Sequence, residues 1–182
     1  MVGTPRCGVR NLSDQWRIPD AAARRPYHKS IALRARSEML LAMLNENAPR
    51  IRTEVQVMFF DTDCAAVVHN IAYLRFIEVA RTLLAEELGL GLAAMAETQK
   101  YPVVVRTEID YRRAAKLGDK LVIEGWLDRL ERVRFWCAFR IVRPLDETLI
   151  AECRQMLAII QMPDAKLLRV PDDWDRYRID PA

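Results

Sequence analysis

One long helical pattern, followed only by strand patterns, constrains the fold of this chain more than any other feature. Apolar side chains recur from residue 71 to residue 88 at the spacing of a helix that buries one stripe, and Gly89 provides a stop. We expect a helix of about 18 residues, roughly 27 Å long, which is enough to cross a sheet. The stripe, interpreted as core, comprises Ile71, Leu74, Ile77, Ala80, Arg81, Leu83, Leu84 and Leu88.

Five segments carry the apolar alternation of β-strands. One precedes the helix, at residues 51–60, and four follow it, at 103–111, 121–127, 133–141 and 148–162. The last three are joined by short connections with turn residues, which predicts antiparallel pairing. A second, short helix is expected over residues 92–97. One long helix and five strands make an α+β domain whose sheet must curl around the helix.

These elements predict a domain at residues 51–163, followed by a tail at 164–182 whose aromatic residues suit a terminal turn. Residues 1–50 are interpreted as a flexible N-terminal extension or as a start assigned upstream of the true one. Residues 37–44 within this extension could form a short helix, ended before Pro49.

Composition excludes several classes of protein. The net charge of +3 arises from residues 1–38, with eight Lys/Arg against three Asp/Glu, and the slightly acidic remainder argues against nucleic-acid binding. No apolar run reaches the roughly 18 to 20 residues of a membrane span. The four cysteines lack the paired spacing of zinc sites, so we expect no metal. Free cysteines in apolar strand patterns favour a reducing, cytoplasmic location.

The loop between the first strand and the helix concentrates the groups suited to chemistry. It holds Asp61, Asp63 and His69, and Asn70 is expected to cap the helix. The start of a helix offers unpaired N–H groups and a partial positive charge, which together can hold a developing oxyanion. A carboxylate and an imidazole just ahead of such donors suit acyl transfer or ester hydrolysis.

The same residues carry a resemblance. The run Asp-Thr-Asp-x-x-x-Val-Val-His-Asn-x-x-Tyr-Leu-Arg-Phe-x-Glu-x-Ala-Arg, residues 61–81, resembles the signature of the hydroxybenzoyl-CoA thioesterase family of hotdog-fold acyl-CoA thioesterases. The likeness continues through residues 101–105, 108–111 and 117–121. It implies a hotdog fold, with a curled antiparallel five-stranded sheet around one long central helix. It also implies hydrolysis of an acyl-CoA to free acid and coenzyme A without a cofactor, since coenzyme A is part of the substrate.

The resemblance assigns roles to individual residues. Asp63 matches the general base or nucleophile of the family, and the backbone N–H of Asn70 matches the donor that polarises the thioester carbonyl. His69 is interpreted as orienting water, hydrogen-bonding the region of Asp63 or binding the thioester, and Tyr73 as a wall of the substrate pocket. Purely structural roles compete with these: Asp63 as a loop cap, His69 and Tyr73 as packing residues. Asp61 is expected to be solvated or to form the turn.

Basic residues near two turns are candidates for the phosphates of coenzyme A. They are Arg112, Arg113, Lys116, Arg132 and Arg134, and ordinary surface charge is the alternative for each. The resemblance further implies a homo-oligomer, a dimer or a homotetramer built of dimers, with sites at the subunit interface and possible phosphate contacts across it.

Two departures keep other interpretations open. Ala66 stands where the family commonly has Gly, so a positive φ there would strain the loop. Cys64 could be read as a nucleophile, but no activating histidine arrangement accompanies it. The alternative function is a non-catalytic acyl-CoA-binding or scaffold protein on the same fold. A hotdog dehydratase is disfavoured because the helix lacks the expected pairing of His with an acid.

Overall fold

The computed structural model describes residues 48–178. In chain order its elements are β1 (Arg50–Gln56), η3 (Phe59–Asp61), α2 (Asn70–Glu87), α3 (Leu92–Thr98), β2 (Lys100–Tyr111), β3 (Lys120–Leu130), β4 (Phe135–Arg143), β5 (Thr148–Gln161), β6 (Lys166–Leu167) and η4 (Asp172–Tyr177). Both predicted helices and all five predicted strands are present. The expected extension at 1–50, including its short helix at 37–44, lies almost entirely outside the described residues.

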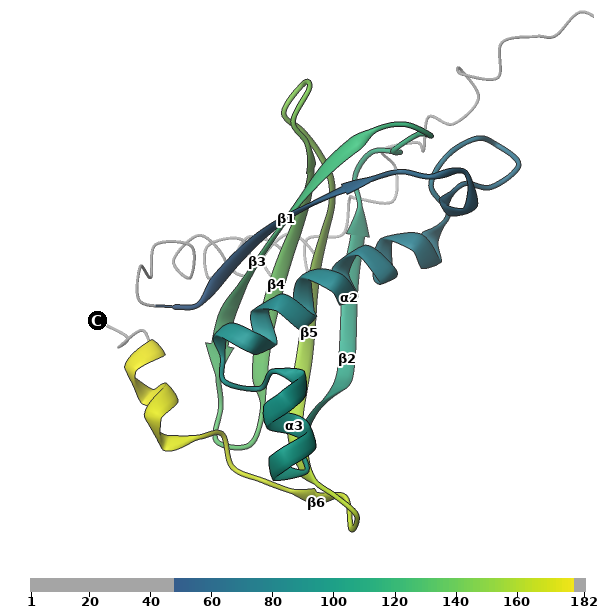
Figure 1. Ribbon diagram of the computed structural model, residues 1–182. Coiled ribbons are helices and arrows are strands. Elements are labelled where there is room, and N and C mark those ends of the chain that lie inside the picture. Colours follow the sequence, from purple (N-terminus) through teal and green to yellow (C-terminus); the bar gives the residue numbers. More distant parts are fainter. Residues whose placement is uncertain (1–47, 179–182) are drawn as a thin grey trace, which may run out of the picture. The chain divides into compact units, whose positions relative to one another are not determined.

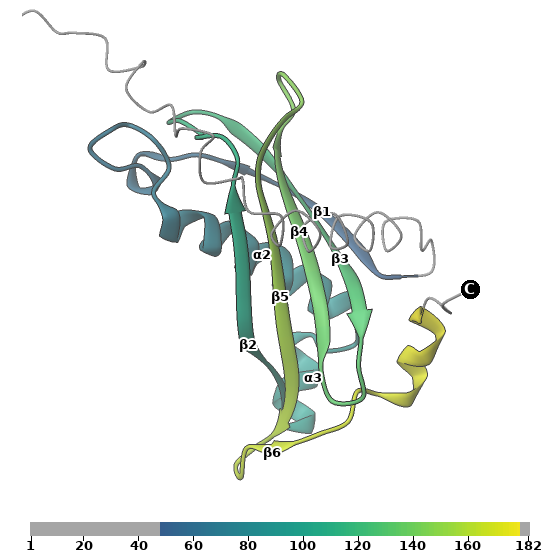
Figure 2. The same ribbon diagram turned by 180° about the vertical axis from the view of Figure 1, so that it is seen from behind.

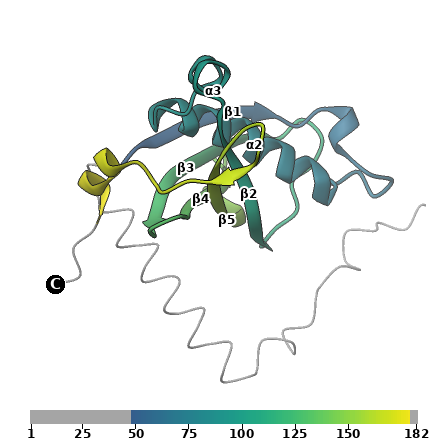
Figure 3. The same ribbon diagram turned by 90° about the horizontal axis from the view of Figure 1, so that it is seen from below.

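The strands form one antiparallel sheet in the order β1-β3-β4-β5-β2, with the short β6 paired to β5. Figure 1 shows α2 lying across the inner face of this sheet, and Figure 2 shows the outer face of the same strands from behind. The view from below, in Figure 3, shows the sheet curving around the helix. The predicted α+β hotdog architecture is therefore confirmed, with β6 as a two-residue addition.

The helix packs onto the sheet through a face that the sequence identifies only in part. Ile77, Ala80 and Leu84 are fully buried, as expected, but Ile71 and Leu83 are 67% and 37% exposed. Tyr73 and Phe76 lie on the buried side of the helix instead of Ile71 and Leu83. Their large aromatic rings gain more from removal from water. The helix is thus apolar on two sides, of which one faces the sheet.

The first strand is shorter than predicted. It pairs with β3 from Arg50 opposite Trp126 to Gln56 opposite Lys120, where β3 begins. Val57 makes the last backbone bonds of this pairing, donating to the Asp119 carbonyl at 2.9 Å and accepting the Gly118 N–H at 3.0 Å. The chain then turns through η3, so Phe59 and Phe60 are 81% and 64% exposed instead of continuing the alternation. The prediction of a strand through residue 60 is wrong for this reason.

The strand β2 lies at the edge of the sheet and contains a bulge. Its register with β5 shifts between Val104 and Arg106, so Val105 has no partner in the ladder. The regular alternation expected over residues 103–111 is therefore interrupted at the bulge. Val104 and Val105 are 40% and 52% exposed, so this edge presents apolar side chains as well as unpaired backbone groups.

Gly125 in β3 is required by close packing across the sheet. A Cβ at this position would come within 2.8 Å and 2.9 Å of ring carbons of Phe139 and within 3.2 Å of Ile51. Because Phe139 is completely buried, its ring has little room to move away. We expect Gly125→Ala to lower the free energy of unfolding in urea by about 1 to 3 kcal/mol.

A second glycine provides the control for this substitution. A Cβ at Gly91 would meet only the side chain and Cα of Glu86, an exposed residue, at 3.2 Å or more. Gly91 is also the N-cap of α3, where alanine is less favourable than glycine, so Gly91→Ala should lower stability by no more than about 1 kcal/mol. Equal effects of the two substitutions would show that the sheet gives way around Gly125 and that the close packing is not a constraint.

The tail after β5 contributes to the core. Trp174, on η4, is only 2% exposed, and its ring packs edge-on against Phe135 with 5.1 Å between the ring centroids. Val170 is also buried. The terminal turn expected from the aromatic residues is confirmed by η4, and part of the predicted tail packs into the same hydrophobic core as α2 and the sheet.

Candidate active site

The loop from Asp61 to His69 is a small hairpin joined to the rest of the domain. The Asp63 N–H donates to the Val67 carbonyl at 3.0 Å, and the His69 N–H donates to the Asp61 carbonyl at 3.0 Å. The Val68 N–H donates to the Ala115 carbonyl at 2.9 Å, which ties the hairpin to the connection between β2 and β3. These bonds hold the start of α2 at the base of the hairpin. Asp63 lies two residues further along the hairpin, roughly 7 Å from its base.

Asp61 is an anchor of this hairpin and is not solvated. Its side chain is 1% exposed, and its Oδ2 accepts the Met58 N–H at 2.9 Å. Its other oxygen forms an ion pair with Arg75 on α2. The guanidinium of Arg75 also lies over the ring of Phe60, 4.8 Å from its centroid. The prediction of a solvated Asp61 is wrong, while its role in forming the turn is confirmed.

Asp63, in contrast, is exposed to solvent. Its Oδ1 accepts the N–H of Ala65 at 2.8 Å, which orients the carboxylate within the loop. Among residues 48–178 no donor contacts Oδ2. One carboxylate oxygen is therefore held in place and the other remains open to water or to a ligand.

The start of α2 differs from the expected cap. His69, and not Asn70, is the N-cap, because its Nδ1 accepts the N–H of Ala72 at 3.2 Å. Asn70 is the first helical residue, so its backbone N–H has no acceptor within the helix. The imidazole thus has a structural task, and the free Asn70 amide lies at the positive end of the helix dipole.

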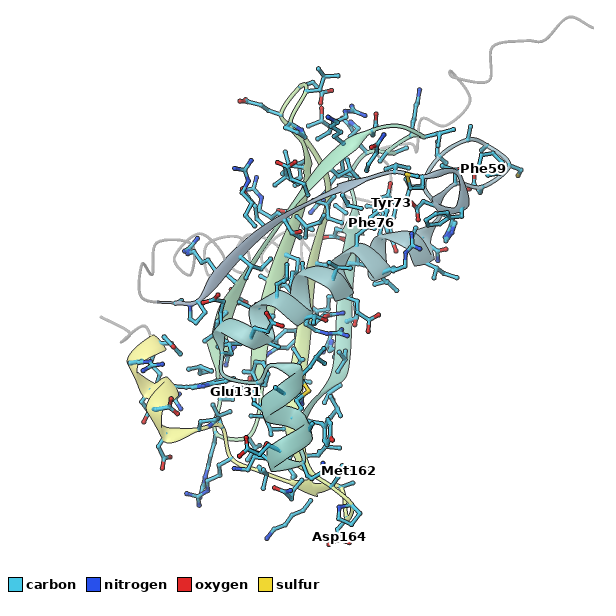
Figure 4. The ribbon with its side chains drawn as sticks, in the orientation of Figure 1. Phe59, Tyr73, Phe76, Glu131, Met162 and Asp164 are labelled. Atoms are coloured by element: carbon cyan, nitrogen blue, oxygen red, sulfur yellow. The ribbon has the colours of Figure 1, made fainter. Side chains whose placement is uncertain are left out.

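Tyr73 connects the helix to the β2–β3 connection from inside the core. It is 4% exposed, and its hydroxyl accepts the N–H of Ala115 at 3.1 Å. Burial raises the pKa of the Tyr73 hydroxyl above its usual value of 10, so the phenol stays neutral. Figure 4 shows Tyr73 and Phe76 close together at this end of α2. A contact between Tyr73 and substrate remains a prediction.

The candidate phosphate-binding residues do not form one cluster within the chain. Arg112, Arg113 and Lys116 follow β2 beside the hairpin, where Lys116 forms a bridge with Val67. Arg132 and Arg134 belong to the turn between β3 and β4. That turn, marked by Glu131 in Figure 4, lies at the far end of an 11-residue strand, roughly 35 Å long.

Arg112 is already engaged by protein carboxylates. Its Nη2 lies 3.0 Å from an oxygen of Glu152 and 3.0 Å from an oxygen of Asp110. Binding a phosphate at this guanidinium would have to compete with both carboxylates. Arg113 and Lys116 are the better placed candidates in the same region, because both are exposed and no described carboxylate pairs with their side chains.

Ala66 has a φ of +57°, which confirms that the loop needs a left-handed residue where the sequence has no glycine. A left-handed conformation costs an alanine roughly 1 to 2 kcal/mol. We expect Ala66→Gly to raise the free energy of unfolding by about 0.5 to 1 kcal/mol, after allowing for the greater entropy of an unfolded glycine.

The neighbouring Ala65 is the matched control, because it is exposed and its φ is not positive. Ala65→Gly should be neutral or destabilising by up to about 1 kcal/mol. Thermal unfolding of the two variants beside the wild type makes the comparison. A stabilisation by both would point to general loop flexibility as the cause, and not to the backbone angle at residue 66.

A buried polar connection between α2 and the sheet was not predicted as part of a site. The Nη1 of Arg81 donates to Oε1 of Gln155 at 3.0 Å, and Nε2 of Gln155 donates to Thr107 at 3.3 Å. Gln155 is 4% exposed. Arg81 stands out in the sequence as an arginine within an otherwise apolar helix stripe. That pattern does not reveal that its partner is Gln155 on β5.

The described part of the chain has two further properties that bear on function. Across residues 48–178, no three His, Cys, Asp or Glu side chains gather closely enough to hold a metal ion. No helix in the same range has the length and apolar character needed to cross a membrane.

Comparison with known proteins identifies the family. The sequence model of the thioesterase-like superfamily matches residues 57–176. The chain belongs to this superfamily. The match includes the hairpin, α2 and all strands from β2 onward, so this thioesterase-like chain carries the family sequence through both its candidate site and its core.

Individual relatives support the assignment of this thioesterase-like protein. It is 29% identical over 120 residues to the acyl-CoA thioesterase YbgC of Haemophilus influenzae, covering 65% of this chain and 87% of that protein. It is 25% identical over 122 residues to the 1,4-dihydroxy-2-naphthoyl-CoA hydrolase of Synechocystis, covering 66% and 88%. The crystal structure of a 1,4-dihydroxy-2-naphthoyl-CoA thioesterase from Synechocystis matches with a TM-score of 0.62 and 24% identity, over 70% of this chain and 94% of that one.

Proposed function

We propose that the protein hydrolyses acyl-CoA thioesters to a free acid and coenzyme A, with Asp63 as the catalytic carboxylate. The observation that carries this proposal is the hairpin itself, which presents an exposed, oriented carboxylate next to an unpaired helix amide. Membership in the thioesterase-like superfamily and the named activity of YbgC support the reaction class.

In this proposal the thioester carbonyl approaches the start of α2. The Asn70 N–H and the helix dipole stabilise the negative charge that develops on the carbonyl oxygen. The free oxygen of Asp63 acts in one of two ways. It takes a proton from the attacking water, or it attacks the carbonyl carbon to form a mixed anhydride that water then hydrolyses. Coenzyme A leaves as its thiol in either case.

His69 supports this arrangement by capping the helix. Because its Nδ1 accepts the Ala72 N–H, the ring cannot also take a proton at that nitrogen without losing the cap. We therefore assign His69 a positioning role at the helix start. Its Nε2 remains the atom through which it could orient water.

We further propose that two copies pair along the edge strand β2. This edge is 12 residues long and carries unpaired backbone groups together with the exposed Val104 and Val105. The outward side of α2 adds exposed apolar residues, including Ile71 and Val79 at 67% and 53%. A two-fold axis near the middle of β2 would place the Tyr111 end of one strand against the Pro102 end of the other. Sedimentation equilibrium tests the dimer directly.

The test of the activity is hydrolysis of a panel of short, long and aromatic acyl-CoAs, followed by release of the coenzyme A thiol. We expect turnover of at least one class. Binding of acyl-CoA by calorimetry, with no thiol released across the panel, would instead support the non-catalytic binding protein. Cytoplasmic location and assembly of dimers into a tetramer remain predictions.

A further inference from the structure

A cavity of about 120 Å³ lies between the C-terminal half of α2, α3 and the sheet. Its walls are apolar side chains except for two residues, Arg81 and Thr82. An apolar cavity of roughly 150 Å³ holds one benzene ring. The volume therefore suits a compact group of about six heavy atoms.

The floor of this cavity is rigid. Phe135 and Cys137 form part of it from β4, and Trp174 packs edge-on behind Phe135. Burial raises the pKa of the Cys137 thiol far above its usual value, so the thiol stays neutral and acts as an apolar surface. With these residues fixed by the core, the cavity cannot deepen without disrupting the packing of the domain.

Arg81 places a fixed cation in the wall of this apolar cavity. One of its five N–H groups is bound by Gln155 at 3.0 Å and one by Glu78 at 3.2 Å. Gln155 is buried and held by Thr107, so the guanidinium is positioned before any ligand arrives. Within the described part of the chain, no other acceptor takes its remaining N–H groups.

We propose that this cavity holds the acyl group and that Arg81 selects acyl groups ending in an oxygen acceptor, a hydroxyl or a carboxylate. The proposal rests on the thioesterase function above. Arg81 is ion-paired with the exposed carboxylate of Glu78, so a ligand oxygen would bind the remaining N–H groups of the guanidinium. An apolar end group would leave those N–H groups without an acceptor in the pocket. The substrate class is thus a short acyl-CoA of about six carbons with a polar end.

The cavity reaches the catalytic carboxylate through the proposed dimer. Within one chain, Leu84 lies 14 residues along α2 from Asn70, which is roughly 21 Å. Pro102, however, lines the cavity from the opposite end of β2 to Tyr111, whose hydroxyl donates to the Asn70 carbonyl at 3.5 Å. Antiparallel pairing along β2 would therefore bring Asp63 of the partner subunit toward this cavity.

Three acyl-CoAs that differ only at the terminal carbon test the inference: hexanoyl-CoA, 6-hydroxyhexanoyl-CoA and adipoyl-CoA. The wild type should have a kcat/KM at least about tenfold higher for one of the two polar substrates than for hexanoyl-CoA. Dodecanoyl-CoA should be a poorer substrate than all three. A wild type that prefers hexanoyl-CoA to both polar substrates, or that prefers dodecanoyl-CoA, would overturn the inference.

Substitutions at Arg81 test whether this residue causes the preference for polar acyl ends. Arg81→Met should bring the ratio of kcat/KM for the polar and apolar substrates to about one, and Arg81→Lys should retain part of the preference. Arg129→Met, at an arginine that does not line the cavity, should keep the wild-type ratio. Should Arg81→Met fail to fold, the wild-type ratio and Arg81→Lys still decide the outcome.

Binding separates this inference from the proposed function. Calorimetry with Asp63→Asn measures the affinity for the same three acyl-CoAs without turnover. The same order of affinities, in a protein whose wild type releases no thiol, would support the cavity and overturn only the hydrolysis. Hydrolysis by the wild type without any preference would overturn only the role of Arg81.

Discussion

Replacing Asp63 with Asn is expected to lower kcat for acyl-CoA hydrolysis by about 10² to 10⁴-fold, the usual contribution of a general base, and by more if the carboxylate is a nucleophile. The substitution keeps the size of the side chain and an oxygen that can accept the Ala65 N–H at Oδ1. The loop should therefore keep its shape while the charge is lost. Thiol release at saturating acyl-CoA measures the effect.

Two other carboxylates make the comparison specific. Asp110→Asn changes an exposed carboxylate on β2 and should leave kcat near the wild-type value. Asp61→Asn weakens the buried ion pair with Arg75, so it should lower stability more than it changes the chemical step. Retention of activity in a folded Asp63→Asn protein would remove this residue from the mechanism.

Trp174→Ala is expected to give the largest loss of stability, about 3 to 5 kcal/mol in the free energy of unfolding. The indole is 2% exposed and packs edge-on against Phe135, so its removal leaves a cavity that the surrounding strands cannot fill. Urea unfolding followed by circular dichroism measures the change. The same variant should also loosen the floor of the cavity beside α3, because Phe135 loses its support.

Phe59→Ala is the matched control, since this aromatic ring is 81% exposed and carries little core packing. Its effect on the free energy of unfolding should stay within about 0.5 kcal/mol. If Trp174→Ala proved equally mild, η4 would have to be docked weakly in solution, and the domain would be independent of residues beyond β6.

The sequence predicts the elements well and their faces less well. The helix ends at Glu87, just before Gly89 as expected, because a left-handed glycine is a local stop signal, and the φ of Gly89 is +74°. Which side of α2 meets the sheet depends on the sheet, so a helix that is apolar on two sides leaves the choice open. Ile71 was expected in the core and is exposed for this reason.

The candidate site shows the same division between local and distant information. The positive φ of Ala66 could be anticipated from the resemblance, and the hairpin confirms it. His69 caps α2 where Asn70 was expected, and this depends on the orientation of one side chain, which no sequence pattern encodes. The separation of Arg134 from Lys116 follows from the length and direction of β3, which only the folded sheet reveals.

The order of strands in the sheet has a consequence for how the domain folds. The pairs β3–β4 and β4–β5 join neighbours in the chain, whereas Gln56 of β1 pairs with Lys120, and Lys100 of β2 pairs with Gln161. Because closing long loops is slow, the central meander should form early and both edge strands should dock late. The hairpin that contains Asp63 connects β1 to α2, so the proposed catalytic arrangement should be among the last parts of the domain to form. Its amides should also be among the first to exchange in native-state hydrogen exchange.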